Sequence, residues 1–320
     1  MLHDIHPVCS AFSGVSCSGL EFYSRFRYHP GFSAGEVSRM SSIDFSLLFD
    51  DENSGFFVMS SGEVIALCVA VRSVWESGYF DVPMARLHCF SSSNFDTDLL
   101  SVIVNKTIQH AFESSGICHF SIDVDVDNYK VLNCLSGSGF EILDLKRTYF
   151  TNKLGANPEF SRSVARVRDY TDADADTVRE IIAAARFETR FTRDRFLSRD
   201  ASDALYQQWF LNLVKDSGLG SHVVVFERMG RVVGCGGIGE MSFSRYGIDR
   251  KMRTGSLYAC SSEGVGGYAP VLYRLTSDAI ASHGLVETTV SLNNASAVRV
   301  VEGVRPNRST TSYAMRRFIQ

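Results

Sequence analysis

The sequence has no C-x-x-C pair, although it contains eight cysteines among 320 residues. The cysteines are scattered, and several lie inside apolar, strand-like runs such as residues 66–70. This distribution is typical of buried free thiols in a reducing compartment. The sequence also has no run of about 18 apolar residues, and its N-terminus lacks the basic and apolar regions of a signal peptide. We therefore expect a cytoplasmic protein with no membrane-spanning segment.

Basic residues are not in excess, because 32 Lys and Arg stand against 36 Asp and Glu, giving a formal net charge of −4. Without a basic patch we expect no nucleic-acid partner, whereas a ligand with a few phosphates stays compatible. The hydrophobic fraction of 45% is that of a globular protein. His3 and His6 are spaced like metal ligands, but no third ligand accompanies them and we expect no metal.

The length suffices for about two domains. A small, polar, proline-containing stretch predicts a linker at 156–163, between domains at 1–155 and 164–320. Hydrophobic periodicity in the second domain predicts the order β-α-α-β-β-β-α-β-α-β. The segments behind this order are strands at 163–168, 222–228, 231–239, 287–292 and 309–319, helices at 174–185, 201–214, 271–283 and 295–301, and an apolar strand that ends near 260.

The first domain repeats the later part of this order. Its expected strands are 56–59, 64–71, 84–90, 118–124 and 140–150, and its expected helices are 97–113 and 128–135. Asn128 and Asn294 open matching segments, so the repeat period is about 165 residues. The fold class is therefore α/β, in the α+β sense, with two copies of one domain built on mixed, mostly antiparallel sheets flanked by helices.

A glycine-rich turn stands out in the second copy, where the apolar run 256–260 meets Gly264-Val265-Gly266-Gly267-Tyr268-Ala269 and a helix follows. Strand, bare turn and helix together point backbone N–H groups and a helix N-terminus at an anion. The first copy has Ser91-Ser92-Ser93-Asn94-Phe95-Asp96-Thr97 at this place. Because an aspartate repels phosphate and a phenylalanine hinders close approach, we expect only the second copy to hold a phosphate-bearing cofactor.

Residues 164–320 resemble a GNAT-type N-acetyltransferase domain, so the whole chain is predicted to have a tandem GNAT fold. The resemblance is carried by the loop Gly264-x-x-Gly267-x-Ala269, the helix-opening Asn294 and the final helix and strand. Three further features resemble the dTDP-fucosamine acetyltransferase family of nucleotide-amino-sugar acyltransferases. They are Thr189-Arg190-Phe191, the Tyr206-x-x-Trp209 helix and the ending 309–317. The competing Rossmann and P-loop patterns are excluded by an antiparallel hairpin before the loop and by the missing G-x-x-x-x-G-K-[ST].

The resemblance implies a cofactor, acetyl-CoA or another short acyl-CoA, and a small-molecule amine as acceptor. It implies a cofactor site made of Ala259, Gly264, Val265, Gly266, Gly267, Tyr268, Ala269 and Asn294. Substrate contacts are then expected at Arg190, Phe191, Tyr206 and Trp209. Each has a plainer interpretation: a tight turn for the glycines, a helix cap for Asn294, a surface charge for Arg190, and core packing for Tyr206 and Trp209.

The sequence departs from the family at two positions. Gly264 replaces the usual Arg or Gln of the loop, and Val301 stands where the family has the tyrosine that protonates the leaving thiolate. Candidates for catalytic groups are therefore Tyr258 and Tyr313, with Cys260 as another proton source, and Glu240 as a base acting through water. Water itself is a further proton source, and Glu240 is alternatively a surface carboxylate.

The sequence thus predicts an N-acyltransferase that acts on a small amine, foremost a dTDP-linked deoxyamino sugar. Two alternatives stay open: an acetyltransferase for another small amine, such as an aminoglycoside or a thiol-sugar precursor, and a catalytically weak CoA-binding sensor or scaffold. The oligomeric state is not decided by the sequence, and a homodimer is one option.

Overall fold

The structure is a computed structural model, and it describes residues 5–8, 17, 19–21, 24–49, 53–61, 63–93, 95–154 and 166–320. The chain forms two compact units. Unit 1 contains residues 1–27, 34–145 and 311–320, and unit 2 contains residues 28–33 and 146–310. The proposed linker at 156–163 lies outside the described residues.

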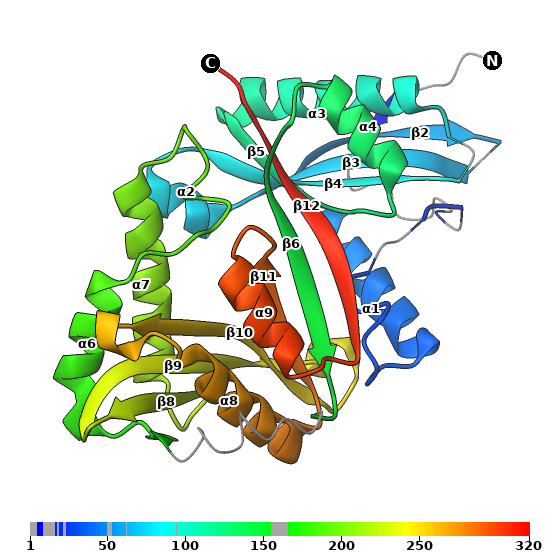
Figure 1. Ribbon diagram of the computed structural model, residues 1–320. Coiled ribbons are helices and arrows are strands. Elements are labelled where there is room, and N and C mark those ends of the chain that lie inside the picture. Colours follow the sequence, from blue (N-terminus) through cyan, green and yellow to red (C-terminus); the bar gives the residue numbers. More distant parts are fainter. Residues whose placement is uncertain are drawn as a thin grey trace. The chain divides into compact units, whose positions relative to one another are not determined.

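Unit 1 is a sheet with the strand order β1-β2-β3-β4-β5-β12. Its elements are β1 (Ile5–Pro7), α1 (Ala34–Ser46), a 3-10 turn (Leu47–Phe49), β2 (Ser54–Ser60), β3 (Glu63–Arg72), α2 (Val74–Phe80), β4 (Met84–Ser91), α3 (Thr97–Ser115), β5 (His119–Asp125) and α4 (Tyr129–Gly137). The helices α3 and α4 lie against β2, β3, β4 and β5, and together they enclose the main apolar core of this unit (Figure 1).

Unit 2 is a sheet with the strand order β6-β11-β10-β9-β8-β7. Its elements are β7 (Val167–Asp169), a 3-10 turn (Asp172–Asp174), α6 (Ala175–Ala184), α7 (Arg199–Lys215), β8 (Ser221–Arg228), β9 (Arg231–Ser242), a 3-10 turn (Ser244–Tyr246), β10 (Lys251–Cys260), a 3-10 turn (Ser262–Gly264), α8 (Tyr268–His283), β11 (Val286–Ser291) and α9 (Ala295–Gly303).

The sheet of unit 2 is covered on both faces. A Cβ atom added to Gly236 of β9 would meet Val271 of α8, whereas one added to Gly237 would meet Leu213 of α7. Because successive side chains of a strand point to opposite faces, α8 covers one face and α7 the other. The face under α6 and α7 and the face under α8 each have their own apolar cluster. We refer to these as the α7 face and the α8 face.

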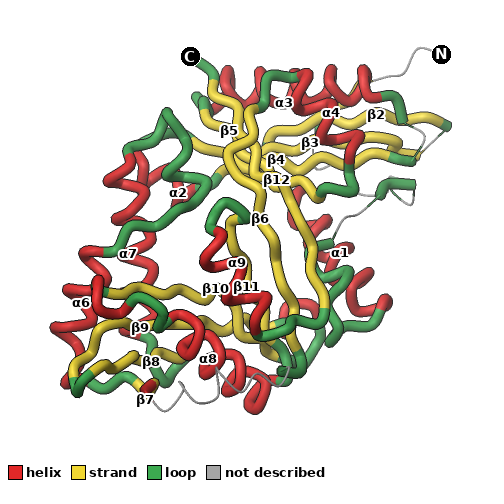
Figure 2. The backbone as a smooth tube through the Cα atoms, in the orientation of Figure 1, coloured by secondary structure: helices red, strands yellow, loops and turns green. Residues whose placement is uncertain are grey.

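The last strand of the first copy is β6 (Glu141–Thr151), and the last strand of the second copy is β12 (Arg308–Phe318). Most of β6 belongs to unit 2, and most of β12 belongs to unit 1. In unit 1 the partner of β5 is β12, with Tyr313 opposite Val124. In unit 2 the partner of β11 is β6, with Tyr149 opposite Thr288. Each copy thus lends its last strand to the unit built on the other copy, as the tube of Figure 2 allows the reader to follow.

The sequence-based elements are confirmed with small shifts of their ends, except that residues 163–165 of the predicted strand 163–168 lie outside the described residues and β7 begins at Val167. The repeated order is present as β4-α3-β5-α4 and β10-α8-β11-α9. The helices α1 and α2 were not foreseen, because their apolar faces are weak: α1 buries Met40 alone, and α2 exposes most of Val74 and Trp75. None of the described helices combines the length and the hydropathy that a bilayer crossing requires.

We predict that Met315→Ala, on β12, destabilises unit 1. Met315 is 1% exposed and belongs to the apolar core of that unit, so truncation removes buried surface and leaves a cavity that costs about 2–5 kcal/mol. Native-state hydrogen exchange is the measurement, and it should show lost protection in β5 while β8 and β9 keep theirs.

The control is Ser309→Ala, which changes an exposed residue at the other end of the same strand. If Met315→Ala weakened protection in β8 and β9 and spared β5, the assignment of this strand to unit 1 would be wrong.

Candidate functional site

The strands β10 and β11 of unit 2 run parallel but pair at a single position, Arg253 with Val286. Beyond this pair the register of β10 is also broken against β9, with a bulge between Thr254 and Leu257. Gly255 lies in the bulge with a φ of +70°, a conformation that favours glycine. The strands therefore diverge, and the ladder hydrogen bonds that would join them past the pair are absent from the described structure.

The glycine turn follows directly after the diverging part of β10. The amides of Gly264 and Gly267 are used within the turn, where they donate to the carbonyls of Ser261 and Gly264. Four other amides have no acceptor among the described residues, and they belong to Val265, Gly266, Tyr268 and Ala269. The last two open α8, a helix of 16 residues whose dipole also favours an anion at this end.

Two glycines of the turn, Gly264 and Gly267, lie so close to the sheet that a larger side chain would not fit. A Cβ atom on Gly264 would lie 2.1 Å from the carbonyl oxygen of Val233, and one on Gly267 would lie 2.4 Å from the hydroxyl of Tyr258. Gly266 differs, because its φ is +88° and nothing lies within 4 Å of the added atom. The turn therefore packs closely against the sheet and leaves Gly266 bare toward the outside.

Tyr258, one of the predicted catalytic residues, supports this turn. Its hydroxyl donates a hydrogen bond of 2.9 Å to the carbonyl of Gly264, and its ring stacks on Tyr268 at 5.3 Å between centroids. Burial raises the pKa of Tyr258 far above its usual range, with nearby Cys260 adding to the effect. The phenol is thus held protonated and directed at the loop backbone.

Glu240, the predicted base, lies on the α8 face at the far end of α8. It forms an ion pair with Lys251 at 2.7 Å, and its other oxygen contacts Nε2 of His283 at 2.8 Å. Burial raises the pKa of Glu240, but the hydrogen bonds from Lys251 and His283 outweigh it and the net pKa is lowered. Fifteen residues separate His283 from Tyr268, which is about 22 Å along the helix. The structure does not bring Glu240 to the glycine turn.

Tyr313, Val301 and Asn294 are the other residues that the sequence analysis discussed for catalysis or cofactor binding. Tyr313 belongs to unit 1, where it packs against the apolar core, and so it does not share a unit with the turn. Val301 is 1% exposed within an apolar cluster of α8, α9, β6 and β11. Asn294 caps α9, since its side chain accepts from the amide of Ala297 at 3.1 Å, and Asn128 caps α4 in the same way.

The four residues predicted to contact the substrate gather on the α7 face of unit 2. The rings of Tyr206 and Trp209 are 5.6 Å apart, and Phe191 lies 6.5 Å from Tyr206. The guanidinium of Arg190 sits 4.5 Å above the ring of Phe191. Phe187, which the sequence analysis missed, stacks on Tyr206 at 5.5 Å. Together these rings form a continuous aromatic group.

This aromatic group reaches the bulge of β10. A Cβ atom on Gly255 would lie 2.9 Å from Cζ2 of Trp209, so the indole rests on the bulge backbone. Trp209 is 37% exposed, which is unusual for a ring of its size in contact with the middle of a sheet. The diverging strands thus have the glycine turn at their end and the aromatic group beside their bulge.

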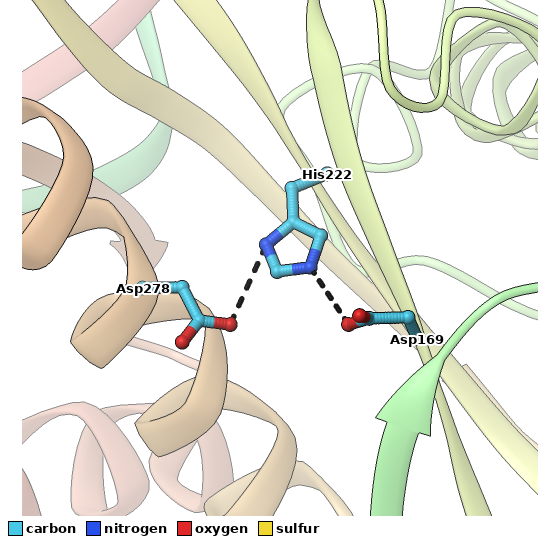
Figure 3. A group of neighbouring side chains, drawn as sticks. All are labelled: Asp169, His222 and Asp278. Carbon is cyan, nitrogen blue, oxygen red and sulfur yellow. Dashed lines mark hydrogen bonds and ion pairs between the residues drawn. The ribbon is translucent and has the colours of Figure 1, made fainter.

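A cluster of Asp169, His222 and Asp278 has metal-like spacing elsewhere in unit 2 (Figure 3). His222 contacts Asp169 at 3.1 Å and Asp278 at 3.7 Å. The guanidinium of Arg274 also binds both carboxylates, at 3.1 and 2.6 Å. Because this cation already offsets their charge, the cluster is a network that joins α8 to β7 and β8, and we infer no metal site there.

No family model and no curated protein sequence matches this chain. Among solved structures it is similar to a GCN5-related N-acetyltransferase from Sphaerobacter thermophilus, with 13% identity, a TM-score of 0.57, and coverage of 91% of this chain and 87% of that chain. It is also similar to a GNAT-family acetyltransferase from Colwellia psychrerythraea, with 13% identity, a TM-score of 0.48 and coverage of 90% and 98%. A tandem GNAT protein from the clavulanic acid biosynthesis pathway has 11% identity, a TM-score of 0.44 and coverage of 83% and 82%.

At such identities a structural likeness establishes the fold alone, and the Sphaerobacter thermophilus protein carries it. The chain has the fold of the GCN5-related N-acetyltransferases, with the order β4-α3-β5-α4 repeated as β10-α8-β11-α9. The resemblance to a GNAT-type domain is thus confirmed at the level of the fold, and the resemblance to the dTDP-fucosamine acetyltransferase family stays a prediction.

We predict that Gly267→Ala lowers the free energy of unfolding by about 1–3 kcal/mol, because the added methyl group overlaps the ring of Phe226 and the hydroxyl of Tyr258. Gly266→Ala should cost about 1 kcal/mol or less, since only its backbone conformation is strained. Urea unfolding of both variants is the measurement. Equal costs at the two positions would show that the turn does not pack on the sheet as described.

Proposed function

We propose that this chain is an acyl-CoA-dependent N-acyltransferase whose cofactor and acceptor both bind to unit 2. The observation that carries the proposal is the divergence of β10 and β11 next to a helix N-terminus with unpartnered amides. When bound, an acyl-CoA supplies an activated acyl group as a thioester.

The glycine turn fits the pyrophosphate of such a cofactor. The amides of Val265, Gly266, Tyr268 and Ala269 are donors without an acceptor in the protein, and the bare Gly266 admits a phosphate to them. Arg228 adds a positive charge, since its guanidinium contacts the carbonyl of Val265 at 3.2 Å. Arg228 and Arg166 also line one surface pocket beside the β8–β9 hairpin, where further phosphate charge would be stabilised.

The diverging strands offer backbone groups to the part of the cofactor between its phosphates and its thioester. The edge of β10 from Leu257 to Cys260 has lost its partner in β11 and can bind an extended amide chain as a strand would. Backbone N–H groups at this edge are also the donors that a developing oxyanion needs. Half-buried Cys260 lies at the end of this edge.

Solvent water protonates the leaving thiolate in the function proposed here. The hydroxyl of Tyr258 is bound to the loop, Tyr313 belongs to unit 1, and the position of the family's tyrosine is the buried Val301. A thiol is acidic enough to leave without a strong acid beside it. These features also favour one other function, a CoA-binding sensor with little turnover, because the valine side chain at 301 cannot donate a proton.

For the acceptor we propose a small primary amine, and in particular the amino group of a nucleotide-linked deoxyamino sugar. The rings of Tyr206, Trp209 and Phe187 offer a flat apolar surface against which one face of a sugar ring can pack. Arg190 on the same aromatic group supplies a cation that suits a phosphate of the nucleotide.

The direct test is a thiol-release assay with acetyl-CoA and a panel of amines. The panel contains dTDP-linked amino sugars, aminoglycosides and an amino-sugar precursor of a low-molecular-weight thiol. We expect CoA to raise the unfolding temperature and the dTDP-linked amino sugars to be acetylated. Turnover of aminoglycosides or of the thiol precursor alone would replace the acceptor, and CoA binding without any turnover would establish the sensor function.

We further predict that Ala269→Pro weakens acetyl-CoA binding about 10-fold or more. The substitution removes one of the four unpartnered amides, and a hydrogen bond to a charged group is worth about 1.5–3 kcal/mol. Proline is tolerated in the first turn of a helix, and the chain already has Pro270 at the next position, so α8 should form. Isothermal titration calorimetry is the measurement.

The matched control is Asp200→Pro, which removes an amide at the same position of the first turn of α7. Acetyl-CoA affinity should not change in this variant. Unchanged affinity in Ala269→Pro as well would remove the glycine turn from the cofactor site.

A further inference from the structure

Two buried side-chain oxygens in unit 2 have no hydrogen-bond partner in the described structure and belong to the same short region of β10 and β11. They are Oε2 of Glu287 and Oγ of Ser256. Glu287 as a whole is only 5% exposed. A buried carboxylate oxygen without a donor is costly, and natural proteins keep such a group where a ligand or the chemistry uses it.

Glu287 lies at the point where the two strands begin to diverge. It directly follows Val286, the residue of β11 that pairs with Arg253, and its Oε1 accepts a hydrogen bond of 3.1 Å from Thr254. Thr254 is opposite Gly239, whose added Cβ would face Leu213 of α7. Since directly opposed residues share a face, Glu287 is on the α7 face, as are the aromatic group and its contact with the bulge.

This region is open although β10 lies in the middle of the sheet. The neighbouring strand β9 buries every residue from Val233 to Ile238. On β10 the whole stretch from Arg253 to Tyr258 is half-buried instead. This stretch of β10 is therefore more exposed than the strand beside it, and Thr254 within it contacts Glu287.

Two other buried carboxylates of unit 2, Asp174 and Asp203, are engaged by hydrogen bonds. Asp174 accepts two hydrogen bonds from Arg168, at 2.7 and 2.8 Å, and two more from the backbone and side chain of Thr171. Asp203 accepts from Arg186 and Arg199 and from the amide of Phe187. Both therefore have structural partners, whereas one oxygen of Glu287 is without one.

We propose that Glu287 is the group that binds the acceptor's primary ammonium and removes its proton, an inference that rests on the acyltransferase function proposed above. The ammonium has three N–H donors, and Oε2 of Glu287 is an acceptor that no donor of the described structure occupies. A proton moves from the nitrogen to Glu287, and the neutral amine then forms the N–C bond while the C–S bond of the thioester breaks. The second nitrogen proton ends on the thiolate, and Glu287 returns its proton to solvent.

The test compares Glu287→Gln with the wild-type protein on two acceptors of equal length, n-butylamine and O-propylhydroxylamine. The first is protonated at pH 7 and the second is neutral, so only the first needs a base. At saturating acetyl-CoA, Glu287→Gln should lower kcat/KM for n-butylamine by about 100-fold or more, the usual scale of general-base catalysis. The loss on O-propylhydroxylamine should stay below about 10-fold, since that nucleophile bypasses the proposed step.

Two further readouts separate this role from a structural one. Asp174→Asn is the matched control: it removes a buried carboxylate that has partners, so it should lower the unfolding temperature but reduce kcat/KM equally and weakly for both acceptors. Glu287→Gln should keep the wild-type unfolding temperature within about 2 °C.

A thermal shift with CoA distinguishes failure of the inference from failure of the proposed function. If CoA does not stabilise the wild-type protein, the acyltransferase function itself is wrong. If CoA stabilises the wild type and Glu287→Gln alike, the cofactor site stands and the acceptor data decide. Equal losses on both acceptors, no loss on either, or a fall in unfolding temperature as large as that of Asp174→Asn would each overturn the role of Glu287. If the wild type binds CoA but acetylates neither amine, the test is the binding of n-butylamine to the CoA complex. The wild type should then bind n-butylamine and Glu287→Gln should not; equal binding would overturn the role of Glu287.

Discussion

The site in unit 2 depends on one feature of backbone geometry, which is that β10 and β11 pair at Arg253 and Val286 and nowhere beyond. Strands buried in a sheet ordinarily satisfy each other's N–H and C=O groups. Here the bulge at Gly255 turns β10 away, which frees the edge from Leu257 to Cys260. The same divergence leaves Oε2 of Glu287 buried without a donor and directs the chain into the glycine turn. The freed edge of β10, the glycine turn and the unpartnered oxygen of Glu287 therefore all lie beside one irregularity of the sheet.

The exchange of closing strands explains how unit 2 tolerates this opening. The free side of β11 is held by β6 over six residue pairs, from Val286 to Ser291, although β6 comes from the first copy. Tyr149 of β6 fills the cluster around Val301, and its hydroxyl donates to Glu302 of α9 at 3.0 Å. Val301 of α9 is one of the apolar residues of this cluster, so α9 also packs on the strand that supports β11.

Much of the fold and part of the site could be predicted from the sequence, because the signals are local. The glycine turn, the cap at Asn294 and the spacing of Tyr206 and Trp209 each lie within a few residues. Glu287 was not foreseen, since a glutamate in an alternating strand is expected on a solvated face, and its partner Thr254 is 33 residues away. The strand exchange gives no sequence signal at all, because β6 and β12 have similar patterns and either could complete either copy. Sequence periodicity predicts strands, but it does not predict which neighbour a strand chooses.

The most direct test of the central claim is amide hydrogen exchange of the whole chain with and without CoA. The account predicts slower exchange in two stretches of unit 2, residues 257–260 of the freed edge and residues 265–269 of the turn, because both would donate to the bound cofactor. The corresponding turn of the first copy, capped by Asp96, should exchange at the same rate in both conditions. Protection at residues 91–97 in place of the turn in unit 2, or no protection at either, would contradict the account.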